Sequence, residues 1–258
     1  MTKKTKIYYS RNHHVSDPIL LVGLPGIGNI GSLVGEHIKN ELKAKKFAVL
    51  YSPSFPHQVI MGKSGSMRMV SNRFYHFKNK KGRSIVVLVG DAQASSPRGQ
   101  YEVNEKIVRF FKRLGGKTIY SVGGYNGTGQ YVPQPRVFGV SNNKKLMHAL
   151  EKNGVRFGEV VGTIWGSAGL IPAMAKRHGI GGACIMGETG MLEIDANAAK
   201  AVIMVLEKVL DIDVNLENID KIKKETEKLL KDLESVSKNM QENQGSGPRG
   251  GETLSYIR

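Results

Sequence analysis

The chain has 258 residues, of which 40% are hydrophobic, and one cysteine, Cys184. This length and composition suit a single α/β domain with a full core and a tail, and one cysteine excludes an internal disulfide framework. Because no apolar run reaches the roughly 20 residues that a membrane helix needs, we expect a cytoplasmic protein without a membrane span.

The net charge of +16 is unevenly distributed, since residues 1–120 carry 21 Lys and Arg against 6 Asp and Glu. Such an excess predicts an anionic partner, and a solvated basic face explains it equally well. The basic residues stand singly or in pairs, without the interleaved aromatics of an RNA-recognition motif. We therefore favour an acidic protein surface as the partner and keep nucleic acid as a less favoured one.

Strand-like and helix-like segments alternate along the chain, as apolar runs that end in glycine and as apolar residues at helical spacing. In chain order we expect strand 18–24, helix 29–42, strand 47–51, a hairpin within 58–77 that turns at 62–66, strand 84–90, helix 100–114, strand 117–124, a loop to 139, helix 143–152, strand 155–165, helix 168–178, strand 182–187 and helix 196–210. Buried strands that alternate with helices predict a three-layer α/β sandwich with a mostly parallel sheet.

Gly26, Gly28 and Gly31 spell G-x-G-x-x-G between the first predicted strand and helix, which is the written form of a dinucleotide-binding turn. Such a site needs an acidic residue about 20 positions further on, and Ser52 and Ser54 stand there instead. We interpret the glycines as small residues that let the helix approach the sheet, and we predict no cofactor.

The carboxyl ends of the predicted strands define a crevice, where open α/β sheets place ligands. Five residues are candidates for it: Gly26, Gly28, Asp91, Gly124 and Glu188. Two carboxylates at strand ends suit acid–base chemistry, and capping of the next helix explains each of them as well. A nucleoside- or nucleotide-binding enzyme is therefore the alternative function. The histidines and Cys184 form no metal-binding pattern, and Cys184 lies inside an apolar strand, so we predict no catalytic and no metal residues.

Four segments carry a resemblance to a known family: "GLPGIGNIG" (23–31), "GDAQ" (90–93), "GGYNGTGQYVPQPRVFG" (123–139) and "GSAGLIPAMAKRHGIGGACIMGETG" (166–190). In this order they resemble the archaeal branch of the proteasome assembly chaperone 2-like family, over residues 17–211. The resemblance implies a fold similar to that of purine nucleoside phosphorylases, a homo-oligomer, and binding to proteasome α-subunits by a non-enzymatic chaperone. We accordingly divide the chain into a domain of residues 1–212, a helix of 213–241 and a tail of 242–258.

The predicted C-terminal helix has apolar residues spaced alternately by three and four, which is the seam of a heptad repeat. The seam positions are Ile219, Ile222, Leu229, Leu233 and Val236, with Thr226 and Met240 in the same register. We favour packing on a neighbouring subunit, and packing on its own domain is the alternative.

A polar, glycine-rich segment at 242–253 then precedes the final five residues. The resemblance makes the C-terminus the binding element, and its residues are Leu254, Tyr256, Ile257 and Arg258. Apolar residues on a flexible tail bury nothing in cis, so we predict docking in trans with capture of the terminal carboxylate. Proteasome activators similarly end in a hydrophobic–tyrosine–any tripeptide, and this chain departs from that pattern because isoleucine holds the tyrosine place.

Overall fold

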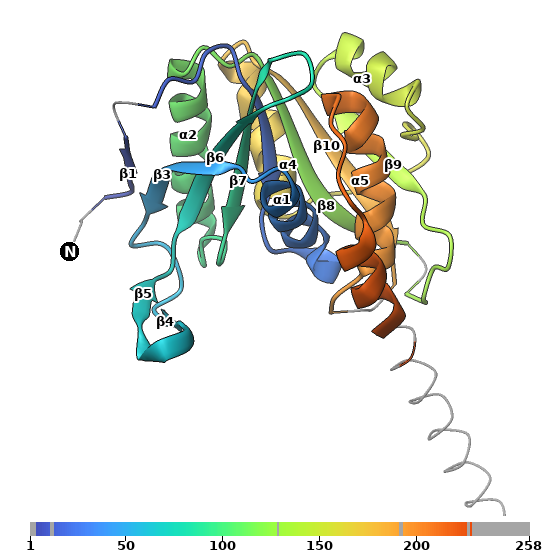
Figure 1. Ribbon diagram of the computed structural model, residues 1–258. Coiled ribbons are helices and arrows are strands. Elements are labelled where there is room, and N and C mark those ends of the chain that lie inside the picture. Colours follow the sequence, from blue (N-terminus) through green and yellow to red (C-terminus); the bar gives the residue numbers. More distant parts are fainter. Residues whose placement is uncertain (1–3, 11–12, 128, 191–192, 226–227, 229–258) are drawn as a thin grey trace, which may run out of the picture.

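The computed structural model describes residues 4–10, 13–127, 129–190, 193–225 and 228. An eight-stranded sheet lies between two layers of helices, and a two-stranded hairpin projects from one side of the domain (Figure 1). The predicted three-layer α/β architecture is confirmed.

The strands and helices follow one another closely in the chain. Their bounds are β1 Lys6–Tyr9, β2 Ile19–Gly23, α1 Ile30–Glu41, β3 Lys45–Tyr51, β4 Val59–Met61, β5 Met67–Met69, β6 Asn72–Lys78, β7 Ser84–Gly90, α2 Pro97–Arg113, β8 Thr118–Asn126, β9 Val137–Ser141, α3 Lys144–Glu151, α4 Ser167–Arg177, β10 Gly181–Thr189 and α5 Ala196–Leu210, with single 3-10 turns at Ile27–Asn29 and Lys63–Gly65.

The strand order is β1-β3-β6-β7-β2-β8-β10-β9. The four central strands β7, β2, β8 and β10 are parallel, as their uninterrupted apolar runs predict, because helices cover both of their faces. The strands on either side pair antiparallel, β1, β3 and β6 at one edge and β9 at the other. The sheet is therefore mixed, with a parallel centre.

Two clusters of buried side chains hold the layers together. One lies between the sheet and the helices α1 and α5, and the other between the sheet and the helices α2 and α4. Helix α2 begins three residues before the predicted start because Ser96 accepts a hydrogen bond from the Gly99 amide at 3.1 Å and Pro97 occupies the first turn. These packed layers fix the strand ends that form the candidate site.

The predicted strand at 155–165 is wrong, because apart from a single β-bridge between Arg156 and Phe138 an irregular loop runs through these residues to the start of α4. Gly158 adopts a φ of +77°, which a strand does not allow. Val161 and Trp165 are 97% and 87% exposed. The strand of this region is instead β9, which begins in the last three residues of the segment that we expected to be a loop.

After α5 the chain turns back and forms a helix at 217–225. Ile219, the first seam position, is 1% exposed and belongs to the cluster under α1 and α5, and Ile222 packs against the same cluster. The seam therefore starts against its own domain. Leu229, Leu233 and Val236, together with Leu254, Tyr256, Ile257 and Arg258, lie outside the described residues. Within the described ranges, no helix has the length and apolar character needed to cross a membrane.

Candidate functional site

The glycine turn joins β2 to α1 at the edge of the sheet where the parallel strands end. A Cβ atom on Gly31 would lie 2.4 Å from the Leu24 carbonyl oxygen and 2.9 Å from that of Val122, so only glycine lets the helix pack this closely. Gly28 has a φ of +59°, in the left-handed region that favours glycine. For Gly26 the packing interpretation is wrong, because no atom lies within 4 Å of its Cβ position.

Gly26 instead lines a cavity of about 240 Å³ at the carboxyl ends of β2 and β8, which the loop 156–165 borders. Gly124 lines the same cavity, whereas Gly28, Asp91 and Glu188 do not. Most of its wall is apolar, with side chains such as those of Phe138 and Met186. Drug-sized ligands occupy cavities of about 300–1,000 Å³, so this one suits a group smaller than a dinucleotide.

Two polar side chains of the cavity wall, Gln93 and Arg156, are already used within the fold. Gln93 donates a hydrogen bond to the Pro25 carbonyl at 2.6 Å and accepts one from the Ser167 amide at 2.8 Å, so it ties the glycine turn to the start of α4. Arg156 contacts Glu159 at 3.4 Å. Among the described residues that line the cavity there is no Asp, Glu, His or Cys. This wall offers contact surface and no acid–base pair.

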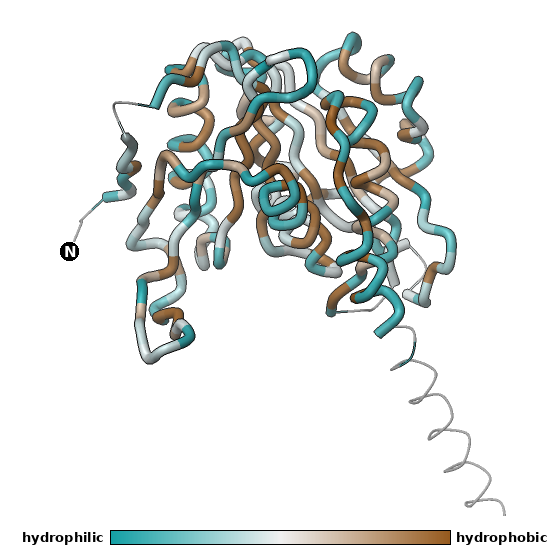
Figure 2. Tube along the Cα trace, in the orientation of Figure 1, coloured by the Kyte–Doolittle hydropathy of each residue, from teal (hydrophilic) through white to brown (hydrophobic). Residues whose placement is uncertain are grey.

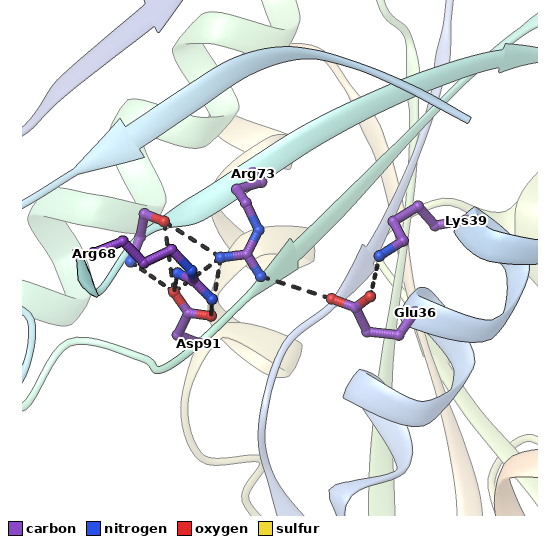
Figure 3. A network of polar contacts seen from close by, with 6 residues as sticks. Glu36, Lys39, Arg68, Arg73 and Asp91 are labelled. Carbon is purple, nitrogen blue, oxygen red and sulfur yellow. Dashed lines mark hydrogen bonds and ion pairs between the residues drawn. The ribbon is translucent and has the colours of Figure 1, made fainter. Parts of the chain in front are cut away.

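Asp91 follows β7, and two arginines hold its carboxylate (Figure 3). Arg68 donates two hydrogen bonds to it at 2.5 and 2.9 Å, Arg73 donates two at 2.9 Å, and the Ser71 amide donates one at 3.0 Å. Burial alone would raise the pKa of Asp91, but these donors outweigh it and lower the pKa to about 2.

Figure 3 shows that the network continues beyond this carboxylate, from Arg73 to Glu36 at 3.7 Å and from Glu36 to Lys39. It thereby connects β5 and β6 with α1. A carboxylate held ionised by two guanidinium groups is a poor general base, so the geometry assigns Asp91 a structural role.

Glu188, near the end of β10, is buried and paired in the same manner. Arg136 donates to its carboxylate from Nε at 2.8 Å and from Nη2 at 2.5 Å. These hydrogen bonds lower the pKa of Glu188. Cys184 lies on the same strand, where burial raises the pKa of its thiol to about 12, so the thiol stays protonated at neutral pH.

Two groups of exposed apolar side chains were not predicted from the sequence. Val161 and Trp165 border the cavity, and the hairpin β4–β5 carries Val59, Met61, Met67 and Met69. For the hairpin a signal was present, because methionines stand directly on both sides of the predicted turn at 62–66. For the loop 156–165 the sequence carries no such signal, because its apolar residues are equally typical of a strand.

Comparison with known proteins finds relatives of this chain in both sequence and structure. The model of the PAC2 family matches residues 20–234. A protein of Methanocaldococcus jannaschii whose function is uncharacterized is 35% identical over 243 residues, which are 94% of this chain and 93% of that protein.

Two solved structures from Pyrococcus furiosus are similar over nearly the whole chain. The first is PbaB, an archaeal proteasome activator, with 34% identity and a TM-score of 0.84, covering 90% of this chain and 100% of that one. The second is PbaA, an archaeal homolog of proteasome-assembly chaperone, with 24% identity and a TM-score of 0.75 over 94% of this chain and 97% of that one. Because the identity to PbaA is only 24%, this second similarity shows a shared fold. Motifs, fold and family match agree, and the chain belongs to the PAC2 family.

Proposed function

We propose that this protein is a non-enzymatic, cytoplasmic proteasome assembly chaperone or activator that binds the α-subunits of the core particle. The observation that carries the proposal is the similarity to PbaB, an archaeal proteasome activator, at 34% identity over 90% of this chain. A likeness over 90% of this chain and 100% of PbaB extends well beyond one motif.

The chemistry of the strand-end crevice supports binding over catalysis. The two carboxylates that suited acid–base work, Asp91 and Glu188, are each held by arginine. The cavity wall is apolar, and its glutamine bonds the protein's own backbone. A crevice whose described lining holds no acid–base pair is suited to present a surface to another protein.

We infer that copies of the chain associate through the C-terminal helix. Its first seam residues, Ile219 and Ile222, pack on the domain, which anchors the start of the helix. By their spacing, Leu229, Leu233 and Val236 continue the seam in the sequence, and we assign them to the contact between copies.

Replacing Leu229 and Leu233 together by aspartate should lower the particle mass measured by light scattering, because charge buried in an apolar seam is costly. The matched control replaces Lys231 and Lys238 by aspartate, since the heptad spacing puts these residues outside the seam. If the seam variant kept the wild-type mass and lost only thermal stability, the whole seam would belong to its own domain.

We further assign the docking contact to the apolar residues near the end of the sequence, Leu254, Tyr256 and Ile257, with Arg258 beside them. They follow a polar glycine-rich segment, whose composition is typical of a flexible linker. Several such segments on one oligomer raise the apparent affinity, because each further contact forms at a linker-limited local concentration.

Deleting residues 254–258 should leave the melting temperature and the particle mass unchanged and weaken binding to purified α-subunits, measured by surface plasmon resonance. Tyr256→Ala should reproduce much of the loss, since an aromatic anchor at an interface typically contributes about 2 kcal/mol or more. Ser255→Ala is the control and should bind as the wild type does. Equal binding by the full-length and shortened chains would exclude this segment as the docking element.

A further inference from the structure

The hairpin β4–β5 has one apolar face that no described part of the chain covers. Val59 pairs with Met69 and Met61 with Met67 across the two strands, so the four side chains lie on the same face of the ribbon. Each is between 54% and 86% exposed. Figure 2 shows hydrophobic residues on this hairpin where it projects away from the body of the domain.

The opposite face of the hairpin fastens it to the domain. Ile60 packs against the cluster under α2 and α4, and Arg68, its cross-strand partner, donates both of its hydrogen bonds to Asp91. A free two-stranded hairpin is only marginally stable in water. These anchors therefore hold the outer face, defined as Val59, Met61, Met67 and Met69, in a fixed position.

The charged residues of the hairpin itself, Lys63 and Arg68, are both positive. Lys63 lies in the turn of the hairpin, is exposed and makes no ion pair within the described residues. The sequence holds no Asp or Glu between Glu41 and Asp91. Two copies that met through this face would bring like charges together, which opposes self-association.

The size of the outer face points the same way. Four side chains make a patch on the order of a few hundred Å², which is in the range of functional patches on monomers. A stable interface needs about 800 Å² from each partner. The face is thus too small to hold a complex alone, and it fits a secondary contact with a partner that the chain also binds elsewhere.

We propose that the outer face of the hairpin is a second docking surface for the proteasome α-subunit, and that it fits an apolar groove bordered by carboxylates. This inference rests on the proposed function, in which the C-terminal residues make the first contact. In Figure 1 the hairpin and the helix 217–225 both lie at the lower end of the domain, the hairpin at its left and the helix at its right, so a partner about as wide as the domain would reach both. Methionine suits such a contact because its flexible thioether adapts to the shape of a groove.

The test replaces Met61 and Met67 together by serine in the full chain and measures binding to purified α-subunits by surface plasmon resonance. Affinity should fall at least fivefold, which is about 1 kcal/mol. Particle mass and melting temperature should stay unchanged, because both side chains are exposed. Met204→Ser is the matched control, since Met204 is an exposed methionine on α5, away from the hairpin.

A second variant, Lys63→Glu, tests the charge of the groove. It should weaken binding and reduce the loss of affinity that added salt causes, because it removes an attraction to carboxylates. The same measurements on the chain shortened by residues 254–258 should show a further loss when the methionines are replaced.

Three outcomes would overturn the inference. If the wild type binds and the methionine variant binds equally well, the proposed function stands and the hairpin is excluded as a docking surface. A fall in particle mass would mean that the hairpin joins copies of the chain. Absence of binding by the wild type, with particle mass intact, would overturn the proposed function and this inference together.

Discussion

Gly31→Ala should lower the free energy of unfolding by about 3 kcal/mol, at the upper end of the usual cost of overpacking. The added methyl group would lie 2.4 Å from the Leu24 carbonyl oxygen and 2.9 Å from the Val122 carbonyl oxygen. Both contacts are with backbone, so no side chain can turn away, and α1 must move off the sheet. This cost exceeds the gain of about 1 kcal/mol that alanine brings to a helix over glycine. Urea denaturation followed by circular dichroism measures the change.

Gly26→Ala is the matched control, five residues earlier in the same glycine motif. Its φ of −173° is extended backbone that any residue adopts, and no atom lies within 4 Å of the added carbon. Stability should therefore stay close to that of the wild type. If both variants lost stability equally, the close approach of α1 to β2 and β8 would not be what the motif provides.

The difference between Gly26 and Gly31 separates what the sequence predicts at the glycine turn from what only the structure shows. The missing acidic residue after the second strand was enough to reject a dinucleotide site, and close packing was the remaining interpretation. The sequence could not tell which glycine packs, because the two oxygens that exclude a side chain at Gly31 belong to Leu24 and to Val122, and Val122 lies on β8, far along the chain. Only the strand order brings that oxygen to the helix.

Asp91→Asn should lower the free energy of unfolding at pH 7 by about 2 kcal/mol, the value that corresponds to the lowered pKa. The folded pKa is about 2, below the ordinary value of 3.8. The carboxylate therefore contributes its stability fully above about pH 4 and loses it as the pH falls toward 2. The difference between wild type and variant should shrink over this range, as measured by urea denaturation at a series of pH values.

Asp213→Asn is the control for this prediction, because the ion pair of Asp213 with Lys80 is also 2.5 Å long but both side chains are exposed. Exposed ion pairs contribute little, so its stability should differ little from that of the wild type at every pH. A wild-type-like stability of Asp91→Asn at pH 7 would mean that the two arginines find other partners.

The carboxylates also show why the candidate site was only partly predictable. Asp91 and Glu188 were recognised as polar residues near strand ends, and the structure places them there. Their partners are Arg68, 23 positions before Asp91, and Arg136, 52 positions before Glu188. Such pairs follow from topology and leave no local pattern, so the sequence left acid–base chemistry and helix capping open for both acids, whereas the fold holds both with arginines.

Regular elements with strong periodicity were predictable, and irregular ones were not. The buried runs of β2, β7, β8 and β10 and the helices between them appear within a few residues of their predicted bounds. The short edge strands β1 and β9 were missed, since β1 is largely exposed and β9 is only five residues long. The loop 155–165 was taken for a strand because its valines and isoleucine have high strand propensity, which the positive φ of Gly158 overrides.

The loop at the cavity also gives the protein a built-in optical probe. Trp165 is the single tryptophan of the chain, lines the cavity and is 87% exposed. All indole fluorescence therefore comes from one place, where the ring is surrounded by water. Any molecule or protein segment that covers it should shift the emission to shorter wavelength, so occupancy of the cavity can be followed in solution without a label.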